Sequence, residues 1–359
     1  MKRVAVTFVC LALAALVASL SACAPTGSSP GAAPASPTTI STATAAAAAT
    51  APQSPTAVPK VDYPTKPITF MIPWPAGGTT DIGGRIIAAA AEKIFGQPIT
   101  VLNKPGASGQ VGWAEMALQK PDGYYIGMIN LPLLNTAILD PERKATFDID
   151  SFIPIMNQVI DPGVLFVRPD SPYKSIKDIV DDAKARPNQI KCGTSGFLSD
   201  DHLAILMLEQ AAGIKLAPVH FDGDAPKVSA LLGGHIDVAW LNVGGFAPQV
   251  KSGQVRAIAV LDRERSKFLP DVPTSVEQGY PTVINVVTRG IAAPKGVPQP
   301  IVKKIEETFV KAAQSPEHVQ KMEEAGYVVK IMVGDEYLKH YREVHEQTKL
   351  LMPLAKQEE

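Results

Sequence analysis

The sequence predicts an α/β protein in which parallel sheets carry helices on their faces. Short apolar segments alternate along the chain with longer segments of helical apolar spacing, which is the pattern of consecutive βαβ units. The stretch from Val61 to Glu359 is long enough for two such domains and too long for one small core. We therefore expect two α/β domains.

Short apolar runs predict the strands, and apolar residues three or four positions apart predict the helices. Strands are expected at Ile68–Ile72, Ile99–Leu102, Tyr125–Ile129, Val164–Val167, Ile190–Gly193, Ile236–Leu241, Ala257–Leu261 and Val328–Ile331. Helices are expected at Ile82–Phe95, Ile176–Ala185, His202–Ala212, Ala225–Leu232, Ile301–Ala313 and Pro316–Ala325. The last of these has a capping Ser315, a first-turn proline and Gly326 as its stop.

The first residues of the chain have the form of a lipoprotein signal peptide. Lys2 and Arg3 are a short cationic start, Val4–Leu20 is apolar, and small residues stand immediately before Cys23. We therefore expect residues 1–22 to be removed and Cys23 to carry a lipid on its thiol. The alternative, an uncleaved membrane helix, is disfavoured because no cationic stop follows the apolar run.

The segment from Cys23 to Lys60 differs in composition from the rest of the chain. It consists almost entirely of Ala, Pro, Ser, Thr and Gly, and Lys60 is its only charged residue. Such a segment cannot bury enough apolar surface to offset the entropy of ordering it. We therefore expect residues 23–60 to be a disordered tether that lets the folded part stand clear of a membrane.

Charge and cysteine usage exclude several functions. Three of the 34 Lys and Arg residues precede residue 61, but none of the 35 acidic residues does. The folded part is therefore weakly acidic, and we expect no nucleic acid as a partner. Cys10 lies in the signal and Cys23 is the lipid anchor, so Cys192 is left without a disulfide partner. No Cys or His cluster has the spacing of metal ligands, and we expect neither a metal nor a cofactor.

Three junctions between a strand and a helix have the composition of ligand-binding loops. The first, Ile72–Asp81, contains two glycines that permit close approach of a ligand, and it runs into a helix whose free N–H groups favour an anion. The alternative is a tight turn in which Asp81 is the N-cap. The second, Cys192–Ser199, is rich in hydroxyls and glycine, and the third, Phe221–Pro226, opens a short helix. Because ligands bind beyond the carboxyl ends of parallel strands, the three junctions are expected to face one cleft.

With these segments the chain resembles a known family, the solute-binding receptors of tripartite tricarboxylate transporters, also called Bug receptors. The resemblance covers Tyr63 to about Met352 and rests on Tyr63–Ile68, Pro73–Asp81, Asn103–Gly109, Pro121–Tyr124, Leu231–Asp237 and Leu269–Thr274. It implies a two-lobed fold of the periplasmic-binding-protein type, a Venus flytrap with two mixed or parallel sheets flanked by helices. Such a receptor closes around a small organic carboxylate and delivers it to a membrane permease.

In receptors of this family two loops grip one carboxylate through backbone N–H groups, hydroxyls and bridging waters. The resemblance carries this role to Ala76, Gly77, Gly78, Thr79, Thr80 and Asp81 in the first loop, and to Gly193, Thr194, Ser195 and Gly196 in the second. The third junction departs from the family pattern, in which an aromatic residue, a basic residue and a glycine precede Ala-Pro. Here Phe221 lacks a phenol, and Asp222 and Asp224 add negative charge.

The acidic residues at the third junction disfavour a second carboxylate. The far end of the ligand is therefore not simply assumed to be another carboxylate. Asp224 either caps its helix or reads a polar group of the ligand, and Ala225 follows it at the same helix end. Arg289 lies on the segment that should return the chain to the first lobe. Its planar guanidinium suits a bidentate contact to a second carboxylate, and the alternative is a solvated arginine at a strand end.

Three further residues complete the expected site. Trp74 forms the cleft wall or packs in the core, and Asn130 and Asn242 follow strands from which they could reach the cleft. We expect residues 61–166 plus 290–359 to form one lobe and residues 167–289 to form the other. The ligand is expected to be a dicarboxylate or an aromatic carboxylate.

The expected function is that of a monomeric, lipid-anchored receptor outside the cytoplasmic membrane that serves the large and small membrane subunits of a secondary transporter. A sensor that signals to a membrane receptor kinase would use the same fold and stays open as an alternative. An extracytoplasmic serine hydrolase is disfavoured, because Ser195 lacks the spacing of a nucleophile elbow and His202 belongs to the first turn of a helix. We therefore expect no catalytic residue.

Overall fold

The computed structural model describes residues 62–355, and all that follows concerns this part of the chain. The predicted signal peptide, Cys23 and the tether lie outside the described residues. Within them, none of the helices combines the length and the apolar character that crossing a bilayer requires.

The first group of strands forms the sheet of one lobe. Its order is β2, β1, β3, β9 and β4, and β10 pairs with β4 on the other side. The strands are β1 (Ile68–Ile72), β2 (Ile99–Asn103), β3 (Tyr125–Leu131), β4 (Phe152–Val167), β9 (Val286–Pro294) and β10 (Val328–Val333). β1 pairs in parallel with β2 and β3, whereas β9 pairs antiparallel with β3 and β4. The sheet is therefore mixed. The alternation of strands and helices along the sequence had indicated parallel pairing alone.

The second group of strands starts from the end of β4. Residues 163–167 of β4 pair antiparallel with β7 and β8, and β5 pairs in parallel with β6 and β7. These strands are β5 (Lys191–Thr194), β6 (Ala217–His220), β7 (Val238–Asn242) and β8 (Arg256–Leu261). β4 changes groups at Gly163, where a Cβ atom would lie 2.7 Å from Nδ2 of Asn285. Glycine at this position thus lets β4 pass close to Asn285, which lies in the second connection between the lobes, just before β9 (Val286–Pro294).

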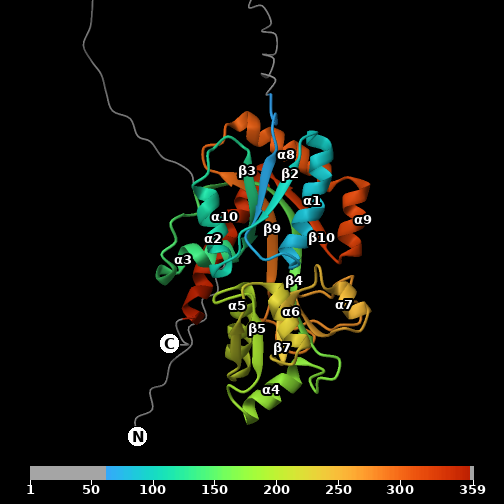
Figure 1. Cartoon of the computed structure of the whole chain (residues 1–359). Coiled ribbons are helices and arrows are strands. Elements are labelled where there is room, and N and C mark those ends of the chain that lie inside the picture. Colours follow the sequence, from blue (N-terminus) through green and yellow to red (C-terminus); the bar gives the residue numbers. More distant parts are fainter. Residues whose placement is uncertain (1–61, 356–359) are drawn as a thin grey trace, which may run out of the picture. The chain divides into compact units, whose positions relative to one another are not determined.

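Helices flank both groups of strands (Figure 1). Around the first group lie α1 (Thr79–Phe95), α2 (Gln110–Ala117), α3 (Leu133–Leu139), α8 (Gln299–Ala313), α9 (Pro316–Glu324) and α10 (Gly334–Ala355). Around the second lie α4 (Ile176–Ala185), α5 (Asp200–Ala212), α6 (Asp224–Leu232) and α7 (Ala247–Lys251). The architecture is thus α/β with two lobes.

The second lobe has a hydrophobic core on each face of its sheet. Leu165 and Val167 of β4 pack in the core that contains Cys192 and Trp240, whereas Val164 and Phe166 pack in the core that contains Leu231 and Phe246. Successive side chains of a strand point to opposite faces. The continuous apolar run at residues 164–167 is therefore the pattern of a strand covered on both sides.

Every strand and helix expected from the sequence is present, with ends shifted by a few residues in most cases. The sequence reading missed β6, β9, α2, α3, α7, α10 and the first part of β4. Asn157, Gln158 and Asp161 interrupt the apolar pattern of β4, and Arg289 interrupts that of β9. All four side chains are buried and hydrogen-bonded in the structure, so polar residues at core positions concealed these strands.

Candidate functional site

A small cavity lies where the carboxyl ends of β1, β5 and β7 meet the first turns of α1 and α6. Its volume is about 20 Å³, which is room for about one water molecule. Most of the predicted site residues line it, namely Trp74, Gly78, Thr79, Thr80, Asn130, Ser195, Asp224, Asn242 and Arg289. Leu133, Asp200, Gly223 and Val287 also line it and were not predicted.

The remaining predicted residues do not line this cavity. Ala76 and Gly77 lie on the exposed outer side of the first loop, and Ala225 is half-buried in the first turn of α6. Gly193 leaves space for a neighbouring side chain, since a Cβ atom there would lie 2.5 Å from Ile236 and 3.0 Å from Lys227. The others, Asp81, Thr194 and Gly196, hold the loops in shape, as described below.

The first loop is held by Asp81, which is a residue of the first turn of α1 and not its N-cap. The N-cap is Gly78, whose backbone is extended and whose position carries no capping side chain. Oδ2 of Asp81 accepts a hydrogen bond from the backbone N–H of Gly77 at 2.9 Å, and Oδ1 accepts one from Nδ2 of Asn103 at 2.8 Å. Asp81 therefore positions the loop that precedes the helix.

The N-terminus of α1 is aimed at the cavity through Thr79 and Thr80. The backbone N–H of Thr79 and its Oγ1 both donate to Oδ2 of Asp224, at 3.2 and 2.6 Å. Oγ1 of Thr80 accepts from Nδ2 of Asn130 at 2.7 Å. The hydroxyl of Tyr327 fixes the same turn by donating to the carbonyl of Thr79 at 2.6 Å.

The second loop, between β5 and α5, presents Ser195 to the cavity. Oγ of Ser195 lies 2.8 Å from Oδ2 of Asp201 and 2.9 Å from Oδ1 of Asp224. Thr194 instead contacts Nδ1 of His220 at 2.7 Å. Gly196 has a φ of +122°, and a Cβ atom there would lie 1.9 Å from Oγ of Ser108. Thr194 and Gly196 therefore shape the loop and its approach to the first lobe.

Lys227 is a buried cation beside the cavity that the sequence reading missed. Its side chain is fully buried, and Nζ lies 2.5 Å from Asp201, 3.2 Å from Asp224 and 2.8 Å from Oγ of Ser195. Burial lowers the pKa of Lys227, but the carboxylates of Asp201 and Asp224 outweigh burial and raise it. The only sequence signal was its position three residues after Asp224 on a helix, where side chains meet.

Arg289 is buried in the cleft wall and is not a solvated strand-end arginine. Nη1 pairs with Asp161 at 2.5 Å, and Nη2 donates to Oγ1 of Thr79 at 3.0 Å and to Oδ1 of Asn242 at 2.7 Å. Nε donates to Oγ1 of Thr80 at 3.2 Å. The guanidinium thus connects α1 to the end of β7.

The charges around the cavity are predominantly negative. Three buried acids, Asp161, Asp200 and Asp201, and the largely buried Asp224 face the two buried cations Lys227 and Arg289. Burial and the adjacent Asp201 raise the pKa of Asp200 to about 7. Burial also raises the pKa of Asp224, but Lys227 and the hydroxyl of Thr79 outweigh it and lower this pKa to about 2. Asp224 is therefore ionised at neutral pH, and Asp200 is partly protonated.

Two buried polar atoms of the cavity wall have no hydrogen-bond partner within residues 62–355. They are Nε1 of Trp74, a donor, and Oδ1 of Asn130, an acceptor. Both side chains line the cavity and are at least nine-tenths buried. Because an unsatisfied buried polar group is costly, these atoms are suited to bind polar groups of a ligand or a water molecule.

Comparison with known proteins identifies the family to which this chain belongs. The family model for the tripartite tricarboxylate transporter family receptor matches residues 84–354. The chain belongs to this receptor family. It is 32% identical to the UPF0065 protein in the gbd 5' region of Cupriavidus necator, over 72% of this chain and 78% of that protein. The fold is that of solved periplasmic binding proteins.

Two solved relatives of this receptor contain a dicarboxylate. A Rhodopseudomonas palustris protein with adipate has a TM-score of 0.76 and 25% identity, and the match covers 82% of this chain and 99% of that one. MatC of Rhodopseudomonas palustris with bound malate has a TM-score of 0.74 and 25% identity, over 82% of this chain and 100% of that one. The family consists of solute-binding proteins, which agrees with the expectation that the chain is not an enzyme.

The contacts of Ser195 do not assemble a hydrolytic site in this receptor. A lysine beside a serine can act as a general base when it is neutral. Lys227 is held as a cation by Asp201 and Asp224, since its pKa is raised, so it cannot accept the proton of Ser195. His202 lies in the first turn of α5, where its Nδ1 accepts from the backbone N–H of Leu198 at 3.1 Å.

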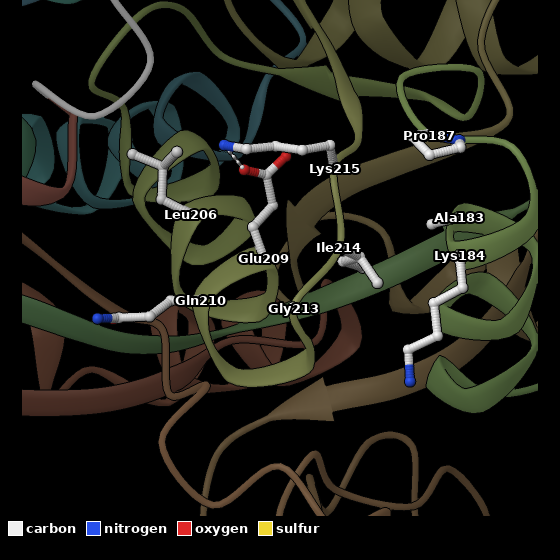
Figure 2. Close-up of a pocket in the computed structure, with 9 residues that line it drawn as sticks. All are labelled: Ala183, Lys184, Pro187, Leu206, Glu209, Gln210, Gly213, Ile214 and Lys215. Carbon is white, nitrogen blue, oxygen red and sulfur yellow. Dashed lines mark hydrogen bonds and ion pairs between the residues drawn. The ribbon is translucent and has the colours of Figure 1, made fainter. Parts of the chain in front are cut away.

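The receptor also has a larger open groove that contains none of the predicted site residues. It has a volume of about 500 Å³ and lies between the ends of α4 and α5. Figure 2 shows the carboxylate of Glu209 turned toward Lys215, to which it is bonded at 2.7 Å. Glu209 also accepts from the backbone N–H of Leu216 at 2.7 Å. Glu209 is thus engaged in holding the segment after α5.

Proposed function

We propose that this receptor captures a small organic carboxylate in the cleft between the first turns of α1 and α6. The observation that carries the proposal is the convergence of donors at this point. The N–H and hydroxyl of Thr79 donate to the carboxylate of Asp224. The hydroxyl of Ser195 and the ammonium of Lys227, which also contact Asp201, lie within 3.2 Å of the same carboxylate. A helix N-terminus with converging N–H and O–H donors favours an anion.

The relatives with adipate and malate support a dicarboxylate as the class of ligand. We propose that one carboxylate is bound by the α1 N-terminus together with Ser195, and that Trp74, Asn130, Asn242 and Arg289 contact the rest of the molecule. Arg289 supplies positive charge to a second acid group.

The remaining parts of the proposal concern location and partners. We propose that Cys23 carries a lipid and that residues 23–60 link it to a monomeric receptor with lobes at residues 61–166 plus 290–359 and at 167–289. The loaded receptor delivers its ligand to the large and small membrane subunits of a secondary transporter. Cys23→Ser is expected to abolish labelling by a lipid precursor, because acyl burial is what anchors the domain. Normal labelling of the variant would contradict this assignment.

A thermal-shift screen of the purified receptor against organic acids tests the ligand class. An acid at about 100 times its dissociation constant stabilises the native state by about 2.7 kcal/mol, which raises the melting temperature by several degrees for a domain of this size. The acid should be recovered chemically unchanged. A broad panel that produces no shift, or turnover of the bound acid, would contradict the proposal.

Transport and signalling are separated by uptake into vesicles that contain the two membrane subunits. Ligand uptake that requires the receptor supports delivery to a transporter. Ligand binding without uptake, together with activation of a membrane kinase, would instead support the sensor alternative.

A further inference from the structure

The carboxylate of Asp224 is surrounded by donors from both lobes. Oδ2 accepts from the N–H and the hydroxyl of Thr79 in α1, at 3.2 and 2.6 Å. Oδ1 lies 2.9 Å from Oγ of Ser195 and 3.2 Å from Nζ of Lys227. Only 12% of the side chain is exposed. Asp224 therefore makes the contacts that a bound anion would make at this helix N-terminus.

The backbone around Asp224 holds its carboxylate in this position. Asp224 is the first residue of α6, and the preceding Gly223 has a φ of +107°, a conformation that glycine adopts without a steric penalty. A Cβ atom at Gly223 would lie 3.0 Å from Cδ of Pro75 in the first loop. The start of α6 is thus seated directly against the loop that precedes α1.

The space next to Asp224 is too small for an organic acid. The cavity has a volume of about 20 Å³, whereas clefts that bind small molecules usually have several hundred. An acid that binds to Thr79 and Ser195 must therefore take these donors from Asp224. Two carboxylates at one position repel each other and cannot share the same N–H and O–H groups.

We propose, resting on the proposed carboxylate-binding function, that Asp224 is an internal competitor whose carboxylate occupies the ligand's anion position and must be displaced when an organic acid binds. Lys227 stays paired with Asp201 at 2.5 Å during the exchange. Displacement costs the contacts of Asp224 to α1, so Asp224 sets how tightly the receptor holds an acid. Only acids that offset this cost through contacts elsewhere in the cleft bind well, which makes Asp224 a specificity-determining residue.

The test is calorimetric titration of malate and adipate into the wild-type receptor, Asp224→Asn and Asp224→Ser. Both variants lack the charge-assisted hydrogen bonds of the Asp224 carboxylate to α1, which an incoming acid must otherwise break. They should therefore bind the acids about ten- to a hundredfold more tightly than wild type. Glu323→Gln is the matched control. It removes another ion pair between the lobes, the exposed contact of Glu323 with Lys267 at 2.9 Å, without touching the anion position, and it should leave the affinity unchanged.

Each outcome bears on a different part of the proposal. Equal or weaker binding in both Asp224 variants, with binding retained in wild type, overturns the competition but leaves the carboxylate receptor intact. Tighter binding in Glu323→Gln as well would assign the gain to easier movement of the lobes, which also overturns it. Absence of binding in wild type and in the variants overturns the proposed function itself. Asp224→Ser keeps the test decisive if the amide of Asp224→Asn disturbs folding.

Discussion

α1 and α6 both begin after a glycine that carries no capping side chain, yet their first turns have opposite roles in the cleft. The first turn of α1 offers the N–H and hydroxyl of Thr79 as donors, whereas the first turn of α6 offers the carboxylate of Asp224 as the acceptor. That carboxylate lies at the positive ends of two helices, and its pKa is lowered to about 2 because Lys227 and Thr79 outweigh the effect of burial. One helix end thus presents hydrogen-bond donors to the cavity, and the other presents an acceptor.

The largest effect is expected from removing Lys227, the cation that pairs with Asp224 in the first turn of α6. Lys227→Met leaves Asp201 and Asp224 buried without their shared cation, which should lower the free energy of unfolding by about 3 to 5 kcal/mol. Lys303→Met is the control, because Lys303 and its partner Glu307 are both exposed where they pair at 4.0 Å, and it should cost less than about 1 kcal/mol. Urea unfolding of both variants measures the difference. Equal losses would show that burial of the pair is unimportant.

The pH dependence of stability tests the effect of burying Asp200 beside Asp201. The pKa of Asp200 is raised to about 7 by burial and by Asp201, against about 3.9 in the unfolded chain. The proton that Asp200 holds in the native state between about pH 4 and pH 7 therefore makes stability fall as pH rises through this window. His202 and His318 act in the opposite direction, because burial lowers the pKa of each to about 4 and the unfolded chain binds the additional protons. Asp200→Asn should remove only the falling contribution, so stability measured by urea unfolding should rise more steeply with pH than in wild type, and an unchanged slope would contradict the assignment.

The two glycine-rich loops should respond differently to an added methyl group. Gly196→Ala requires a φ of +122° from an alanine and places its Cβ atom 1.9 Å from Oγ of Ser108, so it should cost about 1 to 3 kcal/mol. Gly78 has a φ of −82°, and its Cβ atom would meet Asp224 at an ordinary 3.6 Å. Gly78→Ala should therefore cost about 1 kcal/mol or less, which is the ordinary loss when alanine replaces glycine at an N-cap. Thermal unfolding of the pair decides the order, and the reverse order would contradict the geometry.

The smallest effect is expected outside the cleft. Glu323→Gln removes the exposed ion pair with Lys267, and surface pairs of this kind contribute between about 0 and 1 kcal/mol. Its unfolding free energy should match that of wild type within about 0.5 kcal/mol at moderate salt. A larger loss would mean that contacts between the lobes outside the cleft, and not the charges at α1 and α6, dominate their association.

Local patterns determined much of the site from the sequence. The β1–α1 and β5–α5 junctions were identified because a glycine- and hydroxyl-rich loop after an apolar run is visible within about ten residues. Thr79, Ser195 and Asp224 were predicted on this basis or through the family resemblance, and all three line the cavity. The alternation of strands and helices was visible for the same reason, since the periodicities of 2 and 3.6 residues are local properties of the chain.

Only the tertiary structure decided how the buried charges are paired. Arg289 and Asp161 are 128 residues apart in the sequence, and Lys227 and Asp201 are 26 apart. No local pattern links such residues, because a buried ion pair forms only after the elements that carry its members have packed together. The same cause concealed β9 and the first part of β4, whose polar side chains are satisfied across the fold. The sequence by itself predicted most of the strands and helices, together with the loops that carry Thr79 and Ser195 to the cavity. Packing decided which carboxylate occupies the end of α1, because that choice depends on where α6 is seated.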